Sequence, residues 1–226
     1  MTRHVLLAES VTPDRERLTL TLEQGQHVVR VRGEVLMSSR VSGSEEAMAR
    51  LVFSDRARES ISRVLIGGLG MGFTLRAVLD GLGPAAQVLV SELLEPIVDW
   101  NRGPLGCHAG QPLDDPRVEI LLGDVLEHLG TATQAYDAIV LDIDNGPEAF
   151  TVAANNRLYT PLGMGTVYAA LRDGGVLVLW SAFKSPRFER LLRDTGFSAA
   201  SVTVRARGSI AKGARHTVFH ATRPRS

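Results

Sequence analysis

The hydrophobic pattern divides the chain into two parts with different periodicity. In the first part, residues 1–42 have the character of β structure, and 18–22 and 27–32 alternate apolar and polar positions with a period of two. A glycine lies in the short segment between these two runs, so the pattern predicts a β-hairpin. A helix is expected over 44–53, because a capping serine and two acids open that segment.

From residue 63 onward, short apolar runs alternate with amphipathic stretches. The expected strands are 64–66, 88–90, 118–121, 138–141 and 176–180, and the expected helices are 72–82, 95–102, 124–129, 161–172 and 186–195. The strands are continuous apolar runs, which is typical of strands covered on both faces. Alternation of strand and helix predicts a doubly wound, mostly parallel sheet.

Two further strands, 197–205 and 216–222, follow one another directly and predict a closing antiparallel hairpin at the sheet edge. The expected fold is therefore α/β, with a seven-stranded Rossmann-like sheet and a small N-terminal β appendage. We place the appendage and its linking helix at 1–55 and the α/β domain at 56–226.

Composition narrows the functional classes. The chain has 226 residues, 44% of them hydrophobic and 22% charged, with a formal net charge of +0. Such a balance is that of a globular protein without the global charge that draws nucleic acid or membranes. A single cysteine, no signal sequence and no long apolar stretch predict a cytoplasmic protein. We expect no metal, because His and Cys do not occur at metal-binding spacing.

The candidate chemistry begins with a glycine-rich turn after the first strand of the α/β part. Gly67, Gly68, Gly70 and Gly72 fall within six residues, and Glu92 ends the next apolar run, twenty residues beyond the last of them. Glycines allow close approach of the backbone to a ligand, and a carboxylate at the next strand end accepts hydrogen bonds from ribose hydroxyls. The pattern predicts a nucleoside-binding site.

Two more acids follow strand ends. Asp124 comes after the third strand of the α/β part and Asp142 after the fourth. Carboxyl ends of parallel strands meet at one edge of a sheet, where ligands bind. Asp124 alone has the alternative role of a helix cap. Together with Glu92, these acids indicate a polar ligand site at this edge.

This arrangement resembles the class I S-adenosylmethionine-dependent methyltransferase fold. The resemblance implies that the glycine turn passes the methionine part of the donor and that Glu92 binds both ribose hydroxyls. It also implies that Asp124, with the backbone of Val125, binds the adenine amino group, and that Leu93 flanks the adenine. A carboxylate can accept from two hydroxyls or from an exocyclic amine, so the chemistry agrees.

Within that superfamily, the segments 64–76, 115–124 and 136–142 resemble the spermidine synthase (polyamine aminopropyltransferase) family. The sequence departs from two motifs of that family. Gly70 stands where the family's G-G-G-D-G-G motif has aspartate. In the family's D-S-S-D-P motif, Asp142 matches the first acid, and Asn145 falls at the second unless Asp144 takes its place.

The loss of the acid at Gly70 shapes the functional expectation. Decarboxylated S-adenosylmethionine carries an ammonium that an acid would attract, whereas the intact donor carries a carboxylate that an acid would repel. We therefore expect a methyltransferase that uses intact S-adenosylmethionine, with Asp142, or alternatively Asp144, as the catalytic base. The alternatives are an aminopropyltransferase that uses the decarboxylated donor and an inactive nucleoside-binding paralogue.

The acceptor is expected to be a small molecule. Glu46, Asn145 and Tyr159 are the candidate acceptor contacts. Glu45 and Glu46 either face a cation or serve as first-turn acids of their helix. The family resemblance further implies a homodimer.

Overall fold

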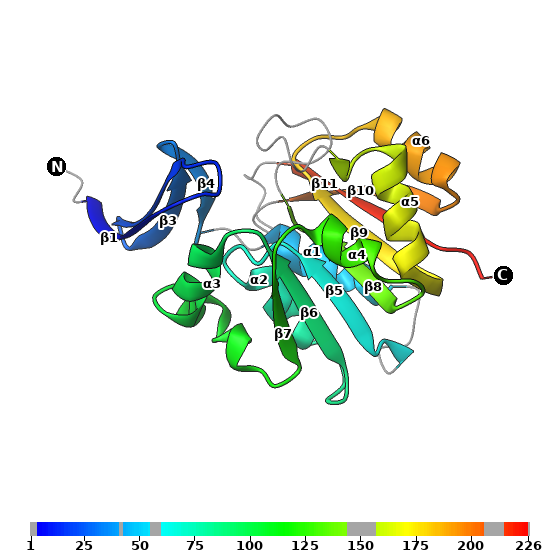
Figure 1. Ribbon diagram of the computed structural model, residues 1–226, viewed down its shortest axis with the longest axis horizontal. Coiled ribbons are helices and arrows are strands. Elements are labelled where there is room, and N and C mark those ends of the chain that lie inside the picture. Colours follow the sequence, from blue (N-terminus) through cyan, green and yellow to red (C-terminus); the bar gives the residue numbers. More distant parts are fainter. Residues whose placement is uncertain (1–3, 41–42, 55–59, 144–156, 206–214, 226) are drawn as a thin grey trace.

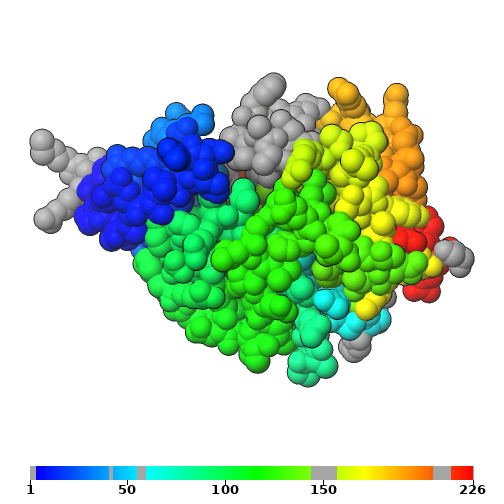
Figure 2. Space-filling view, in the orientation of Figure 1, coloured from blue at the N-terminus to red at the C-terminus, as the bar shows by residue number. Residues whose placement is uncertain are grey.

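The computed structural model describes residues 4–40, 43–54, 60–143, 157–205 and 215–225 (Figure 1). An antiparallel sheet forms the N-terminal part, with strands in the order β1 (His4–Val11), β2 (Arg17–Glu23), β3 (Gln26–Val31) and β4 (Glu34–Ser38). The predicted hairpin is the β2–β3 pair. This small sheet projects from one side of the larger body, as the blue lobe in Figures 1 and 2 shows.

The larger body contains a seven-stranded sheet with the order β10-β11-β9-β8-β5-β6-β7. Its strands are β5 (Arg63–Gly67), β6 (Gln87–Glu92), β7 (Val118–Leu122), β8 (Tyr136–Leu141), β9 (Leu171–Ser181), β10 (Ser198–Arg205) and β11 (Arg215–Thr222). Strands β5 to β9 are parallel, and β10 and β11 form the antiparallel hairpin at the edge. The predicted fold class is confirmed.

The order of the strands creates a switch point at β5. This strand pairs with β6 on one side and with β8 on the other, so the chain leaves it in one direction and returns on the opposite side. In open α/β sheets, ligands bind outside the carboxyl ends of the strands at such a point. The fold therefore directs attention to the ends of β5 and β8.

Helices cover both faces of the sheet. On one face pack α1 (Gly43–Val52), α2 (Phe73–Leu79) and α3 (Glu95–Arg102); on the other pack α4 (Val125–Gly130), α5 (Pro161–Ala170) and α6 (Pro186–Thr195). Two short 3-10 turns, η2 (Gly106–Ala109) and η3 (Pro112–Asp114), lead into β7. The predicted helices agree with these positions to within a few residues.

Successive apolar side chains of the strands point to opposite faces of the sheet. Val64, Val140 and Val178 pack under α1–α3, whereas Leu65, Ile139 and Leu177 pack under α4–α6, and all six are fully buried. Burying one such side chain contributes roughly 1.5–3 kcal/mol. These continuous apolar runs therefore fix the sheet between two helical layers.

Several helix starts follow from local capping. Thr160 accepts a hydrogen bond from the backbone N–H of Gly163 at the start of α5, and Ser185 accepts one from Phe188 at the start of α6. Both helices have proline in the first turn, where its missing N–H costs nothing. Such caps place the helix starts beside the strand ends that precede them.

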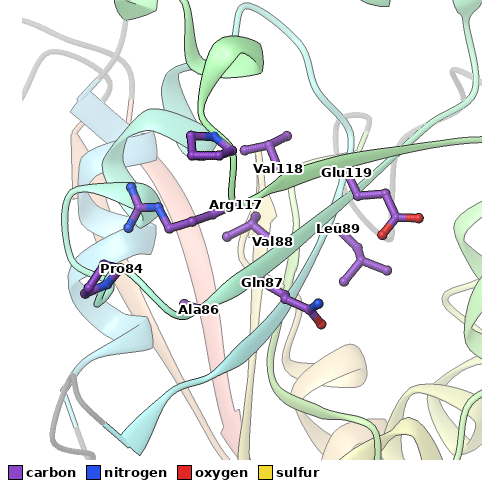
Figure 3. A pocket seen from close by; sticks show the side chains of 9 residues that line it. Pro84, Ala86, Gln87, Val88, Leu89, Arg117, Val118 and Glu119 are labelled. Carbon is purple, nitrogen blue, oxygen red and sulfur yellow. The ribbon is translucent and has the colours of Figure 1, made fainter.

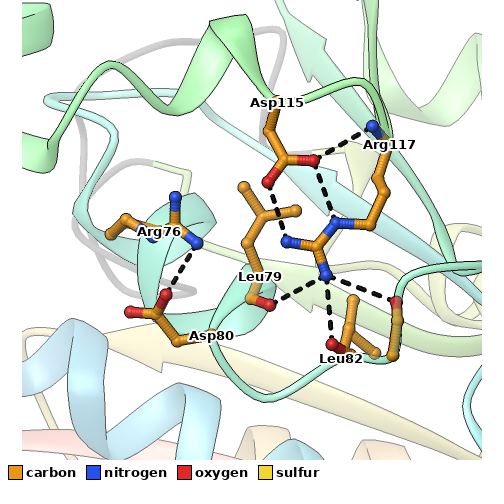
Figure 4. A network of polar contacts seen from close by, with 7 residues as sticks. Arg76, Leu79, Asp80, Leu82, Asp115 and Arg117 are labelled. Carbon is orange, nitrogen blue, oxygen red and sulfur yellow. Dashed lines mark hydrogen bonds and ion pairs between the residues drawn. The ribbon is translucent and has the colours of Figure 1, made fainter.

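A polar network fastens the start of β7 to the end of α2 (Figure 4). Arg117 pairs with both carboxylate oxygens of Asp115, at 2.9 and 2.7 Å, and donates to the carbonyls of Leu79, Leu82 and Gly83. The hydrogen bond from Arg117 lowers the pKa of Asp115 to about 2. Because each guanidinium donor is directed at a carbonyl or carboxylate oxygen, we assign this network a structural role.

The N-terminal sheet is joined to the body through α1, through a histidine pair and through apolar packing, since Leu18, Leu20 and Val29 belong to the same buried cluster as α1–α3. Helix α1 packs against α2 and β9, and His108 Nε2 lies 2.7 Å from His27 Nδ1 of β3. The domain division at residues 55 and 56 stays a prediction. Within the described ranges, none of the helices is long and apolar enough to cross a membrane.

Candidate functional site

The glycine turn lies between β5 and α2, in direct contact with the chain after β8. Gly68, Gly70 and Gly72 have positive φ angles of 88°, 56° and 80°. A Cβ on Gly68 would lie 2.3 Å from the backbone oxygen of Asp142. Only glycine satisfies both the left-handed backbone and this close approach. The turn and Asp142 are thereby held together at the switch point.

Glu92 ends β6 beside the same turn and is 8% exposed. Its two carboxylate oxygens accept backbone N–H bonds from Leu69 and Leu94, each at 2.9 Å. Burial raises the pKa of Glu92, and the backbone N–H bonds oppose that rise. A carboxylate oxygen has more than one acceptor site, so each can also accept from a ligand hydroxyl.

Asp124 caps α4 and also forms an ion pair. Its Oδ1 accepts from the N–H of Leu126 at 2.8 Å, and its Oδ2 lies 2.5 Å from Arg157. The capping role that the sequence left open is therefore present. Arg157 holds the oxygen that an adenine amino group would use, and its side chain is 62% exposed. Contact with adenine thus requires Arg157 to turn toward solvent.

Asp142 follows β8, is half-buried and lies beside the first turn of α2. The hydroxyl of Thr74 donates to its Oδ2 at 2.7 Å, and its backbone N–H donates to Gly67 at 2.9 Å. Burial raises the pKa of the Asp142 carboxyl, and the Thr74 hydrogen bond partly offsets that rise. A half-buried carboxyl with a raised pKa at a switch point is suited to proton transfer or to holding a cation.

Glu45 of α1, which the sequence left open as either a cation contact or a first-turn acid of its helix, is a further acid of this region. It is partly buried, its Oε2 accepts from the Ser44 hydroxyl at 2.8 Å, and burial together with the Asp142 charge raises its pKa to about 7. The predicted acceptor contact, Glu46, instead has a 62% exposed side chain near Arg50. The structure does not bring Glu46 to the site.

The spacing of the buried residues along α1 explains why Glu45, and not Glu46, lies on the inward face of the helix. Met48, Ala49 and Val52 form the buried stripe of α1, and Glu45 lies three, four and seven residues before them. Positions with these spacings share one helix face. Glu46 lies one position off that face. The apolar spacing was thus a usable signal for choosing between the two acids.

Trp180, on the strand next to the end of β8, was also missed. Leu141 pairs with Leu179 in parallel register, so the next residues, Asp142 and Trp180, lie on one face of neighbouring strands. The rings of Trp180 and His216 meet edge to face at 4.8 Å. Within the described residues, the buried Nε1 of Trp180 and Nδ1 of His216 have no hydrogen-bond partner. Trp180, with His216 against its ring, therefore lies on the strand that neighbours the one carrying Asp142.

The other residues predicted to contact a ligand are Asp144, Asn145, Tyr159, Leu93 and Val125. Asp144 and Asn145 lie outside the described residues. Tyr159 donates its hydroxyl to the carbonyl of Ile143 at 3.2 Å. Leu93 is 40% exposed beside Glu92, whereas Val125 is buried.

One surface hollow lies away from these groups. It is formed at the amino ends of β6 and β7, where Gln87, Val88, Arg117 and Glu119 line it (Figure 3). Glu92 lies at the opposite end of β6. The hollow is therefore separate from the candidate site. Among the described residues, no group of three or more His, Cys, Asp or Glu side chains is placed to hold a metal ion.

Comparison with known proteins gives one family. The spermine/spermidine synthase domain model matches residues 43–195. The polyamine aminopropyltransferase of Korarchaeum cryptofilum is 32% identical over 123 residues, which are 54% of this chain and 36% of that protein. Polyamine aminopropyltransferase 2 of Hyperthermus butylicus is 31% identical over 142 residues, 62% of this chain and 45% of that protein.

Solved structures give the same fold. The spermidine synthase of Thermotoga maritima superposes with a TM-score of 0.75 at 18% identity, over 98% of this chain and 74% of that one. A spermidine synthase in complex with the transition state analogue AdoDATO superposes with a TM-score of 0.74. The matched stretches span less than half the length of the two aminopropyltransferases above. Because the family model covers most of the chain, the chain belongs to the spermine/spermidine synthase domain family.

Proposed function

We propose that this protein transfers an aminopropyl group from decarboxylated S-adenosylmethionine to a small polyamine. The observation that carries the proposal is the set of acids at one edge of the sheet, where Glu92 and Asp142 contact the glycine turn and the Asp142 charge acts on Glu45. An anionic site suits a donor and an acceptor that both carry ammonium groups. The relatives named polyamine aminopropyltransferases support the same chemistry, and the expected transferase class agrees with them.

The expectation of a methyltransferase with intact S-adenosylmethionine is wrong. The curated relatives are polyamine aminopropyltransferases, and the matching structures are spermidine synthases. The expectation rested on the missing acid at Gly70 alone. Glu45, which the sequence left open as a cation contact, adds a carboxyl group whose pKa the Asp142 charge raises. A donor carboxylate near these groups would be repelled.

Donor binding is assigned to the groups on β5, β6 and β7. The glycine turn admits the donor close to the backbone, and Glu92 accepts hydrogen bonds from the two ribose hydroxyls. Asp124, after release of Arg157, accepts from the adenine amino group, with Val125 adjacent and Leu93 against the ring. These roles are proposals that follow from the positions of the residues at one sheet edge.

The chemical step is assigned to the region of Asp142. The acceptor amine first loses a proton to a carboxylate, for which Asp142 is the candidate. Its nitrogen lone pair then attacks the methylene carbon attached to the sulfonium. A carbon–nitrogen bond forms, the carbon–sulfur bond breaks, and its electron pair stays on sulfur to give methylthioadenosine. Orientation and proton removal are the main tasks, because the sulfonium is already a strong electrophile.

The proposal is tested by incubating the protein with decarboxylated S-adenosylmethionine and 1,4-diaminobutane and measuring methylthioadenosine by mass spectrometry. We expect this product with the wild type and a loss of about 100-fold or more with Asp142→Asn. Donor binding by the variant, measured by calorimetry, should be largely retained. Absence of aminopropyl transfer to 1,4-diaminobutane, spermidine and related amines would refute the proposed function.

A further inference from the structure

A fully buried asparagine lies behind the glycine turn. Asn101 of α3 is 0% exposed and shares the buried face of that helix with Ile97 and Val98, three and four residues earlier. Such positions are usually apolar, because a polar side chain in a core is stable only where its hydrogen bonds are made. A polar residue on this face therefore indicates a role for its hydrogen bonds.

The amide of Asn101 joins α3 to the turn. Its Nδ2 donates to the carbonyl of Gly70 at 2.9 Å and to the carbonyl of Ile97, one helical turn earlier, also at 2.9 Å. Because both partners are acceptors, they determine which end of the amide carries the NH₂ group. A Cβ on Gly72 would lie 3.2 Å from the Oδ1 of Asn101. The side chain thus lies against the turn at two of its glycines.

The other end of this amide is unsatisfied. Within the described residues, the buried Oδ1 of Asn101 has no hydrogen-bond partner. A buried acceptor without a donor lowers stability, and an apolar side chain of similar shape would avoid that loss. Stability alone therefore does not favour asparagine at this position. The bond from Nδ2 to the turn is what an apolar residue could not supply.

This bond restrains a peptide that has little else to restrain it. Gly70 has a positive φ of 56°, and a Cβ there would meet nothing within 4 Å. No side chain therefore limits the orientation of its carbonyl. The preceding residue, Leu69, donates its N–H to Oε2 of Glu92 at 2.9 Å. Rotation of the Gly70 carbonyl would move the segment that contacts the proposed ribose acid.

We propose that Asn101 is a positioning residue for donor binding, because its Nδ2 holds the Gly70 carbonyl against α3 and keeps the glycine turn in the form that admits the nucleoside. The inference rests on the proposed aminopropyl transfer, whose donor site it concerns. Affinity falls in proportion to the fraction of molecules that hold the binding form. One hydrogen bond corresponds to about a three- to tenfold change in that affinity.

Two variants separate this hydrogen bond from packing. Asn101→Ala removes both, whereas Asn101→Leu refills the buried space with a branched apolar side chain that cannot donate. Both should raise the donor KM about three- to tenfold, and they should leave the acceptor KM and the kcat at saturating donor within about twofold of the wild type. A donor KM restored to the wild-type value by leucine would show that Asn101 acts through packing, and it would overturn the proposal.

A control variant separates this effect from a general loss of stability. Val167 is fully buried in α5, in the apolar cluster on the other face of the sheet from α3. Val167→Ala should lower the free energy of unfolding, measured by urea denaturation beside the two Asn101 variants, and should leave the donor KM unchanged. An equal rise of the donor KM in Val167→Ala and Asn101→Ala would overturn the assignment to the turn.

Calorimetric titration with methylthioadenosine measures the same effect without turnover. Both Asn101 variants should bind this nucleoside about three- to tenfold more weakly than the wild type does. If the wild type makes no methylthioadenosine from decarboxylated donor and any polyamine, the proposed function fails. If it does, and the Asn101 variants keep the wild-type donor KM and nucleoside affinity, only the role of Asn101 fails.

Discussion

Replacement of Glu92 by glutamine tests the assignment of the donor site most sharply. Glutamine has nearly the same shape as glutamate, but its amide nitrogen donates where a carboxylate oxygen accepts. In the structure, Leu69 and Leu94 each donate a backbone N–H to the carboxylate at 2.9 Å. One of these donors would then face an NH₂ group, and one ribose hydroxyl would lose its acceptor.

The size of the effect follows from the burial of the group. Glu92 is 8% exposed, so water can do little to replace a lost acceptor. Hydrogen bonds to charged groups contribute about 1.5–3 kcal/mol each. Loss of one charged hydrogen bond to a ribose hydroxyl should therefore weaken donor binding by about 1.5–3 kcal/mol, which is a factor of roughly 10 to 150.

Isothermal titration calorimetry with decarboxylated S-adenosylmethionine measures this loss. Urea denaturation of the free variant separates lost binding from lost folding, because unpaired Leu69 or Leu94 also lowers stability. Glu119→Gln is the matched control, since Glu119 is an exposed acid on the neighbouring strand β7. Donor affinity of a folded Glu92→Gln protein within about threefold of the wild type would refute the ribose assignment.

Three further outcomes follow from the same structure. Gly68→Ala should lower the free energy of unfolding and the turnover by more than Gly25→Ala does. Both glycines have positive φ, but only Gly68 lies against the Asp142 carbonyl. Denaturation and activity assays compare the two variants. Gly70→Asp should bind decarboxylated donor about fivefold more tightly than Gly70→Asn, a difference of about 1 kcal/mol, because Asp adds only a charge in open space; equal affinities would contradict this. Glu45→Gln should raise the free energy of unfolding by up to about 3 kcal/mol at pH 8 and should leave it unchanged at pH 4. The reason is that the pKa of Glu45 is raised from 4.5 to about 7, so the wild type loses stability as the pH rises through that range. Urea titrations at both pH values measure the difference.

Much of the fold could be predicted because its signals are local. The apolar runs of β5, β6 and β8 are buried on both faces, and their period and length distinguish them from the helices between them. The β2–β3 hairpin carries a period of two and a turn glycine. Strands β1 and β4 were expected only as general β structure, because their exposed faces lack a clear alternation.

The donor side of the site was accessible for the same reason. Glycines and acids that follow consecutive strands come to one edge by topology alone, so their spacing carries the information. The acceptor side was less accessible. Which of Glu45 and Glu46 faces inward depends on the rotation of α1, and Trp180 becomes a neighbour of Asp142 only through the register of β8 and β9. Such relations join distant segments and leave no contiguous motif.

The error about the donor has a similar origin. The expectation of intact S-adenosylmethionine followed from the absence of an acid at Gly70, while the alternative that Glu45 faces a cation was given less weight. Glu45 lies 25 residues earlier in the chain (70 − 45 = 25) and restores acidity from another element. A missing charge in one motif therefore did not define the charge of the site.

Competition between the two donors tests the central claim most directly. The protein is incubated with equimolar S-adenosylmethionine and decarboxylated S-adenosylmethionine together with a mixture of small amines, and the two sulfur products are quantified in one sample by mass spectrometry. The account predicts that methylthioadenosine accumulates while S-adenosylhomocysteine stays at the level of a protein-free control. Accumulation of S-adenosylhomocysteine without methylthioadenosine would contradict it.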